Sequence, residues 1–243
     1  MYPILHLGAL RIESYALFTY LASFAGAWYL YYRLVHTEHL DRFQVILILI
    51  FVFSVETIGG KILPCVWHWY KHGVFPQCFL SRGAGRYFHG VLLSAIAATV
   101  FYCKIRKWPT KRVLDYFAIS ACLMSPLGRI GCFLNACCKG KPTNLPWAVT
   151  FPHSLTPVHP AQLYHFFFEL FILLPVLLWF DKRKKGDGQT FWLYIYLYSI
   201  FRYWVEFVRT NPIAWLGLTH AQLFSIAAAV VSGVVLVKCY PRR

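Results

Sequence analysis

The chain has 243 residues, of which 58% are hydrophobic and 14% charged, and its mean hydropathy is +0.51. Water-soluble domains are about 45–50% apolar and about 25% charged, so this composition does not describe one. Lys and Arg outnumber Asp and Glu by 24 to 9, for a formal net charge of +15. Such a charge is typical of nucleic-acid binding, but here the basic residues lie between long apolar runs. The composition therefore excludes a soluble nucleic-acid binder and predicts a membrane protein with basic loops.

Seven segments are apolar enough to cross a bilayer, which takes about 20 residues in a helix. In chain order they are residues 15–34, 44–63, 87–103, 113–136, 162–180, 190–208 and 218–239. Short charged breaks or stretches with Gly and Pro separate them, and we find no low-complexity linker and no internal repeat. We therefore expect an all-α, polytopic membrane protein with seven transmembrane helices, in which residues 1–243 form one domain.

Basic residues are distributed unevenly between the two ends of these segments. Fourteen Lys and Arg lie on one side, which includes the 181–188 loop and the C-terminal end, and seven lie on the other. Because cytoplasmic loops carry an excess of Lys and Arg, the N-terminus is predicted outside and the C-terminus in the cytoplasm. The long loops 64–86 and 137–161 then face outward. The first segment has neither a basic start nor a small-residue cleavage site, so we expect a retained helix.

Two arginines lie inside predicted spans, where a charge costs at least about 2.5 kcal/mol. Arg129 is deep in the fourth span, on one helical face with Cys132 and Asn135. Arg202 is in the middle of the sixth span, and His89 opens the third span in the stretch RGAGRYFHG. Since a guanidinium binds phosphate through a bidentate fork, two membrane arginines suit a phospholipid headgroup.

The sixth span carries a polar stripe at the spacing i, i+4, i+8 and i+11, formed by Tyr198, Arg202, Glu206 and Arg209. A structural alternative is that Arg202 and Glu206 form an ordinary i,i+4 ion pair. In the same way, Arg129 could be held by helix carbonyls. The stripe by itself leaves both interpretations open.

Four segments, in this order and spacing, resemble the bacterial prolipoprotein diacylglyceryl transferases. They are FHGVL (88–92), GRIGCFLNACCKG (128–140), HPAQLY (159–164) and FRYWVEFVR (201–209). Tyr15 in the first span and LTHAQLFSI (218–226) also fit, so the resemblance runs through nearly the whole chain. Each motif is short, but four of them on matching predicted helices are specific together.

The resemblance implies a reaction in the bacterial cytoplasmic (inner) membrane. The lipobox cysteine thiol of a prolipoprotein signal peptide takes the diacylglyceryl group of phosphatidylglycerol as a thioether, and glycerol phosphate leaves. Such a reaction needs a base, because the thiolate is the nucleophile, and cations that stabilise the departing phosphate. The implied partners are phosphatidylglycerol, prolipoprotein signal peptides and membrane lipid, with no nucleic acid and no cofactor.

The same resemblance assigns roles to particular residues. His89 corresponds to the family histidine and is the candidate base, and Arg129 and Arg202 correspond to its two arginines. Tyr198 corresponds to the tyrosine one turn before the second arginine, which completes the candidate catalytic set. The expected substrate-binding residues are Tyr15, Lys61, Asn135, Gly140, Glu206 and Arg209.

The chain departs from the family pattern G-R-x-G-N-F-x-N-x-E at two positions. Cys132 stands at the first Asn and Cys137 at the Glu. Lys61 occupies the place of an arginine, Val91 that of a glycine, and His165 follows Tyr164 where an acid is common. Two alternatives therefore stay open: a paralogue with the same lipid donor but another acceptor, and a non-enzymatic phospholipid-binding or transport protein.

Four of the eight cysteines fall at or near the predicted outer face: Cys65, Cys78, Cys137 and Cys138. A disulfide between the two outer loops and a set of small buried side chains are both open interpretations. Cys132, Cys137 and Cys138 have no second CxxC pair or His cluster at metal-binding spacing, so we expect no metal site.

Overall fold

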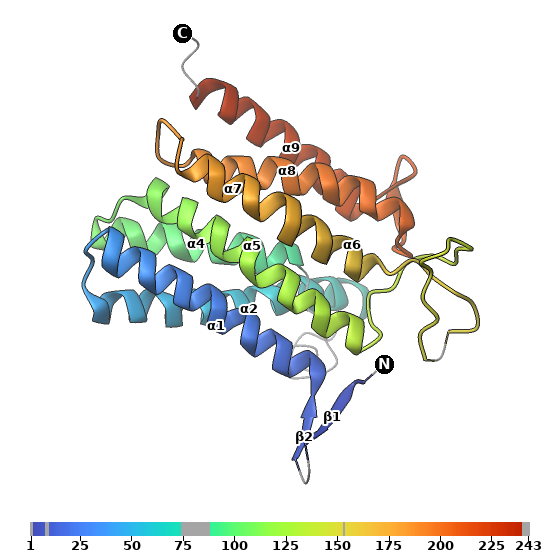
Figure 1. The fold of residues 1–243 in the computed structure, drawn as a ribbon. Helices are drawn as coiled ribbons and strands as arrows, with labels where there is room; N and C mark the ends of the chain where they lie inside the picture. The colour runs from blue at the N-terminus through green and yellow to red at the C-terminus, as the bar shows by residue number, and fades with distance from the viewer. Residues whose placement is uncertain (1, 8–9, 74–87, 153, 240–243) are drawn as a thin grey trace. The chain divides into compact units, whose positions relative to one another are not determined.

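The computed structural model describes residues 2–7, 10–73, 88–152 and 154–239, with some side chains omitted near the gaps. Most of these residues are helical, which confirms the all-α class (Figure 1). The helices, in order, are α1 (Ser14–Tyr32), η1 (Arg33–Thr37), α2 (Arg42–His72), α4 (Phe88–Arg106), α5 (Thr110–Leu134), α6 (Ala161–Phe168), η2 (Glu169–Leu173), α7 (Leu174–Asp181), α8 (Gln189–Val205), η3 (Glu206–Val208) and α9 (His220–Cys239).

Among the described residues, four helices are long and apolar enough to cross a membrane. They are Arg42–Ile62, Thr110–Leu134, Ala161–Asp181 and His220–Lys238. The other three predicted spans are also helical, in α1, α4 and α8. The predicted end of the second span at residue 63 precedes Pro64, which lacks a backbone donor. The helix nevertheless continues through that proline to His72.

Four short strands were not predicted. β1 (Ile4–Leu7) pairs antiparallel with β2 (Leu10–Glu13), and β3 (Ile213–Trp215) pairs antiparallel with β4 (Leu218–Thr219). Each pair forms a two-stranded hairpin next to the start of a long helix, α1 or α9. Strands this short leave no trace in a search for apolar runs of about 20 residues.

The chain divides into two compact units, one of Met1–Leu30 with Asp115–Arg243 and the other of Tyr31–Leu114. In the second unit, α2 and α4 form an antiparallel pair. Gly59 lies against Gly90 and Ser94 at one end, and Tyr102 donates to the Gln44 carbonyl oxygen over 3.1 Å at the other. The absence of a Cβ at Gly59 lets the two helices approach closely.

The first unit contains α1, α5 and the helices from α6 to α9. Ser120 on α5 donates over 3.0 Å to the carbonyl of Gly26 on α1. At one end of the unit, the buried Asp115 carboxylate accepts from Lys184 Nζ at 2.6 Å and from the backbone N–H groups of Gly188 and Phe191, each at 2.8 Å. These bonds fix the α7–α8 loop to the start of α5.

Candidate functional site

Three of the resembling segments meet at the other end of the first unit. The signature segment (residues 128–140) ends at Gly140, which forms an antiparallel bridge with Arg209. Gly140 N–H donates to the His159 carbonyl over 2.9 Å, and Lys141 N–H donates to the Val208 carbonyl over 2.7 Å. The segment after α5 is therefore fixed between the approach to α6 and the end of α8.

Gly140 lies where the surrounding atoms leave no space for a side chain. A Cβ at this position would lie 2.5 Å from the Val208 carbonyl oxygen and 2.7 Å from Cβ of His159. Both neighbours belong to segments that hydrogen-bond across the junction, so neither can move away freely. The glycine predicted from the resemblance thus has a local physical reason.

Glu206 is the centre of a buried polar network. Its carboxylate accepts from Arg202, from Asn211 Nδ2 at 2.6 Å and from Thr219 Oγ1 at 2.9 Å. Arg209 Nε lies 3.7 Å from the same carboxylate, whose side chain has no exposed surface. Three members of the predicted stripe, Arg202, Glu206 and Arg209, are thus connected, and the Arg202–Glu206 pair of the structural alternative is present.

Arg129 lies near the C-terminal end of α5 and is partly exposed. The anionic and polar groups that act on its guanidinium are Tyr198 on α8, Glu169 on η2 and the thiols of Cys132 and Cys138. Arg129 and Tyr198, predicted from separate spans, are therefore brought together. Tyr198 is 6% exposed and stacks on Tyr194 with ring centroids 5.7 Å apart.

A buried histidine–carboxylate pair completes this region. His165 Nδ1 lies 3.0 Å from Glu169 Oε1, and both side chains are fully buried. Arg129, Arg202 and Arg209, which we call the arginine cluster, all act electrostatically on the His165 ring. Sequence reasoning noted His165 as a departure but assigned it no role. The available signal was a second pair of ionisable residues at i, i+4 inside a predicted span.

The regular α-helix is interrupted at Glu169. Residues Glu169–Leu173 form a π-helical turn between α6 and α7. Such turns are rare and occur often at functional sites. Among the described residues, His165 Nε2 and Gln162 Oε1 are buried without a hydrogen-bond partner. Because buried polar atoms are nearly always satisfied, these two indicate a place for water or ligand.

Burial also affects Arg209, which lies just beyond the sixth span. Desolvation lowers the pKa of its guanidinium, and the nearby charges of Arg202 and Arg129 act in the same direction. An arginine starts from a pKa above about 12, so it keeps its charge at neutral pH. The arginine cluster is thus a concentration of positive charge, opposed by the carboxylates of Glu169 and Glu206.

The turn at the C-terminal end of α5 brings three cysteines close together. Ala136 N–H donates to the Phe133 carbonyl and Cys137 N–H to the Cys132 carbonyl, both over 3.1 Å. With Ala136 at φ 55°, this is a Schellman helix end, which places residues such as Cys132 and Cys137 in contact. Cys138 is also left-handed, at φ 62°. The Sγ atoms of Cys132, Cys137 and Cys138 all lie within 4.8 Å of one another.

The remaining predicted residues have different surroundings. The backbone of Tyr15 at the start of α1 lies against Gly131, whose Cβ would be 3.4 Å from the Tyr15 carbonyl oxygen. Asn135 is exposed beside the cysteines. Lys61 on α2 and His89 in the first turn of α4 belong to the other compact unit. The side chain of His89 lies outside the described part of the structure.

Of the two interpretations left open for the outer-loop cysteines, a disulfide is not formed by Cys137 or Cys138, which are free thiols. Cys65 is buried. Cys78 lies outside the described residues. The alternative, in which cysteines serve as small buried side chains, fits Cys65, Cys103 and Cys122.

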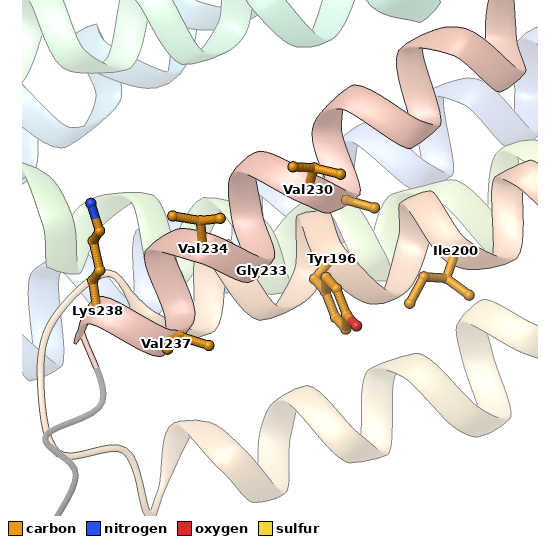
Figure 2. A pocket seen from close by; sticks show the side chains of 8 residues that line it. Tyr196, Ile200, Val230, Gly233, Val234, Val237 and Lys238 are labelled. Carbon is orange, nitrogen blue, oxygen red and sulfur yellow. The ribbon is translucent and has the colours of Figure 1, made fainter.

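An open groove runs along α8 and α9. Figure 2 shows its wall of aliphatic side chains, with Tyr196 and Lys238 as the polar members. It is lined by Tyr196, Ile200, Ala229, Val230, Gly233, Val234, Val237 and Lys238. None of the predicted site residues is among them, and its apolar lining suits a surface that faces lipid.

Comparison with known proteins shows a similarity that extends along nearly the whole chain. The family model described as prolipoprotein diacylglyceryl transferase matches residues 3–238. Proteins named phosphatidylglycerol–prolipoprotein diacylglyceryl transferase are similar over most of their length. The one from Clostridium tetani is 32% identical over 73% of each chain, and the one from Finegoldia magna is 30% identical over 87% of this chain and 84% of its own.

A third such protein, from Methylococcus capsulatus, is 31% identical over 97% of this chain and 94% of its own. The match thus includes the segments that meet at Gly140, the polar stripe of α8 and the second compact unit. The chain belongs to the prolipoprotein diacylglyceryl transferase family.

Proposed function

We propose that this protein transfers the diacylglyceryl group of phosphatidylglycerol to the lipobox cysteine of prolipoproteins. A carbon–sulfur bond forms between the thiol and the glyceryl carbon, and the bond from that carbon to the phosphate oxygen breaks. Glycerol phosphate leaves with the electron pair, and the thiol proton passes to a base. The observation that carries the proposal is the arginine cluster, gathered at one end of the first unit in a chain that belongs to this family.

Arg129 and Arg202 are the proposed ligands of the lipid phosphate. Arg202 contacts Glu206 through one terminal nitrogen, and a guanidinium has five N–H donors in a planar fork. The pair with Glu206 therefore orients Arg202 and leaves donors for an anion. The three guanidinium groups of the cluster exceed the two carboxylates beside them in charge, which favours a phosphodiester and stabilises the leaving group.

His89 is the proposed base. A neutral imidazole accepts a proton near neutral pH. His89 lies in the first turn of α4, at the N-terminal end of that helix. Under the proposed topology that end is the outer one, where an exported precursor arrives. In the sequence, His89 follows Gly83 and Gly85 and precedes Gly90.

The other predicted residues take supporting roles in this proposal. Tyr198 lies beside Arg129 and is placed to share the phosphate site. Glu206 and Arg209 hold Arg202, and Gly140 fixes the signature segment against Arg209. Tyr15, Asn135 and Lys61 are the proposed contacts to the rest of the substrates.

The proposed setting is the bacterial inner membrane, crossed seven times by a single domain of residues 1–243. The N-terminus is outside and the C-terminus cytoplasmic, as the charge distribution favours. The contacts of Gly140 with Arg209 and of Thr219 with Glu206 gather the loops after α5 and α8 at one end of the first unit. The basic α7–α8 loop is bonded to Asp115 at the other end. The α7–α8 loop carries four Lys and Arg at 182–185, whereas the 137–161 loop carries two, Lys139 and Lys141. This excess of basic residues on the α7–α8 side supports the orientation.

A second candidate keeps the lipid donor but changes the acceptor. It is favoured by Cys132 and Cys137, which replace an amide and a carboxylate in the signature segment. A third, binding of a phospholipid without chemistry, needs the arginine cluster but no base.

Complementation distinguishes these possibilities. The gene is expressed in a bacterium depleted of its own transferase, and a lipobox reporter is followed by gel shift. Growth together with a shifted reporter supports prolipoprotein as the acceptor. Failure of both, with the protein present in the membrane and phosphatidylglycerol bound, favours another acceptor or a binding role.

A further inference from the structure

The three thiols of Cys132, Cys137 and Cys138, which we call the thiol cluster, converge by a local mechanism. The Schellman end of α5 brings Cys137 back over Cys132, and the left-handed backbone at Cys138 turns the third side chain the same way. Non-glycine residues in this conformation cost roughly 1 kcal/mol each. Two of them within three residues indicate that the surrounding structure enforces this arrangement.

The surroundings hold the turn from outside. Gln162 is fully buried and its Nε2 donates to the Cys137 carbonyl oxygen. Three residues after Cys137, Gly140 is bonded to His159 and bridged to Arg209. The thiol cluster is therefore attached to the start of α6 and the end of α8. The segment that carries the three thiols is thus held by two other parts of the chain, so its conformation does not depend on the loop alone.

The sulfur spacing suits a bound metal ion. Three sulfurs around one ion, each at about 2.3 Å from it, lie about 3.8–4.0 Å apart. The Sγ atoms of the thiol cluster are all within 4.8 Å of one another, so only small side-chain rotations separate the observed spacing from coordination. A disulfide needs about 2.05 Å between two sulfurs, and all three thiols are free.

The charge around the cluster suits an anionic metal–thiolate complex. Three thiolates with a divalent ion carry one net negative charge, and with a monovalent ion they carry two. Arg129 and Arg209 both act electrostatically on Cys138, and their guanidinium groups offset that charge. Cys138 is exposed, which gives an ion a route in. Soft thiolate ligands select Zn²⁺ or Cu⁺ over harder ions such as Mg²⁺ and Ca²⁺.

We infer that Cys132, Cys137 and Cys138 bind one thiophilic metal ion, Zn²⁺ or Cu⁺, beside the arginine cluster. The spacing in the sequence did not predict this site, because the pattern lacks the usual CxxC pairs. A fourth ligand position is then open to water or to another thiol. Binding of the ion involves no lipid substrate, so it can be tested separately from the transfer reaction.

The test begins with full-length wild-type protein, purified under reducing conditions without a polyhistidine tag and placed in lipid nanodiscs. Titration with Zn²⁺ and, separately, with Cu⁺ against a chromophoric competitor should give about one ion per chain for at least one of the metals. Co²⁺ in place of zinc should produce a sulfur-to-metal charge-transfer band. Cys138→Ser and Cys137→Ser should each lower the affinity at least about tenfold, since even outer-shell changes cost 10- to 100-fold.

Cys103→Ser and Cys122→Ser are the matched controls, because both residues are fully buried cysteines in other parts of the fold. They should keep the full affinity. A second readout needs no variant: the metal should protect Cys138 of the wild type from alkylation by N-ethylmaleimide. Three outcomes would each overturn the inference. These are no binding of either ion by the wild type, alkylation of Cys138 at the same rate with and without saturating metal, or a disulfide within the cluster in protein taken from native membranes.

Discussion

His165 Nδ1 lies 3.0 Å from Glu169 Oε1 in a place where neither side chain has any exposed surface. The pair stands at a π-helical turn and within the field of three arginines. A buried carboxylate in these surroundings compensates the positive charge of the arginines, which the apolar interior of a membrane cannot do. Glu169 in η2 therefore supports the arginine cluster, as Glu206 in η3 does.

The first prediction follows from this pair. Glu169→Ala should lower the free energy of unfolding by about 3–5 kcal/mol, because it removes a fully buried carboxylate that contacts His165 and faces the arginine cluster. Glu169→Gln should cost less, since the amide still accepts a hydrogen bond. Thermal unfolding in detergent measures both. His36→Gln, at an exposed position, is the control and should change stability by less than about 0.5 kcal/mol. A Glu169→Ala protein as stable as the wild type would contradict the assignment.

The second prediction concerns the phosphate ligands. Arg129→Lys and Arg202→Lys should each slow lipid transfer roughly 10- to 100-fold while the protein still inserts, because lysine keeps the charge but loses the fork. Arg106→Lys is the matched control, since Arg106 bonds Gln44 in the other compact unit. Transfer is measured with a lipobox reporter in nanodiscs. Normal rates in both site variants would show that charge alone is enough, or that neither residue acts.

Arg202 needs one further comparison, because its pair with Glu206 is also structural. Loss of folding in Arg202→Ala, with Arg202→Lys active, would assign the residue to the network of Glu206 rather than to the lipid phosphate. Folding is followed by size-exclusion chromatography of the purified variants.

The third prediction separates an enzyme from a binder. His89→Gln keeps the size and a hydrogen-bonding group but removes the base, so thioether formation should cease while phosphatidylglycerol still binds. Both quantities are measured on the same nanodisc preparation. Full transfer by this variant would eliminate the proposed base. Loss of lipid binding together with activity would instead make His89 a headgroup ligand.

A fourth prediction compares two glycines of the signature segment. Gly140→Ala should destabilise the protein by about 1–3 kcal/mol, because its Cβ would meet the Val208 carbonyl oxygen at 2.5 Å. Gly128→Ala is the matched change within α5, where nothing lies within 4 Å of the new Cβ. It should be neutral or stabilising, since alanine is the better helix former. Equal unfolding midpoints for the two variants would refute the packing argument.

The fifth prediction is the orientation in the membrane. Single cysteines introduced in the 181–188 loop and at residue 243 should react only with reagents that reach the cytoplasm. Those in loops 64–86 and 137–161 should react from outside. Labelling of 137–161 from the cytoplasmic side would reverse the proposed topology and remove the route for an exported precursor.

The sequence alone determined where the helices lie and which charges they carry. Hydrophobicity and helical hydrogen bonding are local properties, so runs of apolar residues located all seven helical segments to within a few residues at most ends. It also singled out Arg129 and the stripe from Tyr198 to Arg209, because ionisable residues are conspicuous inside apolar runs. The extension of α2 beyond Pro64 was missed, since it depends on backbone bonds rather than on hydrophobicity.

The tertiary structure decided which of these residues meet. Arg129 and Tyr198 are far apart in the chain, and only the fold of the first unit brings the two side chains together. The burial of His165 with Glu169 required the fold in the same way. The thiol cluster could not be predicted from the sequence for another reason. The three thiols converge because the backbone is left-handed at Ala136 and Cys138. Glycine favours this conformation, and alanine and cysteine give no sign of it in a sequence. Contacts between distant segments follow from side-chain packing, which no local pattern records.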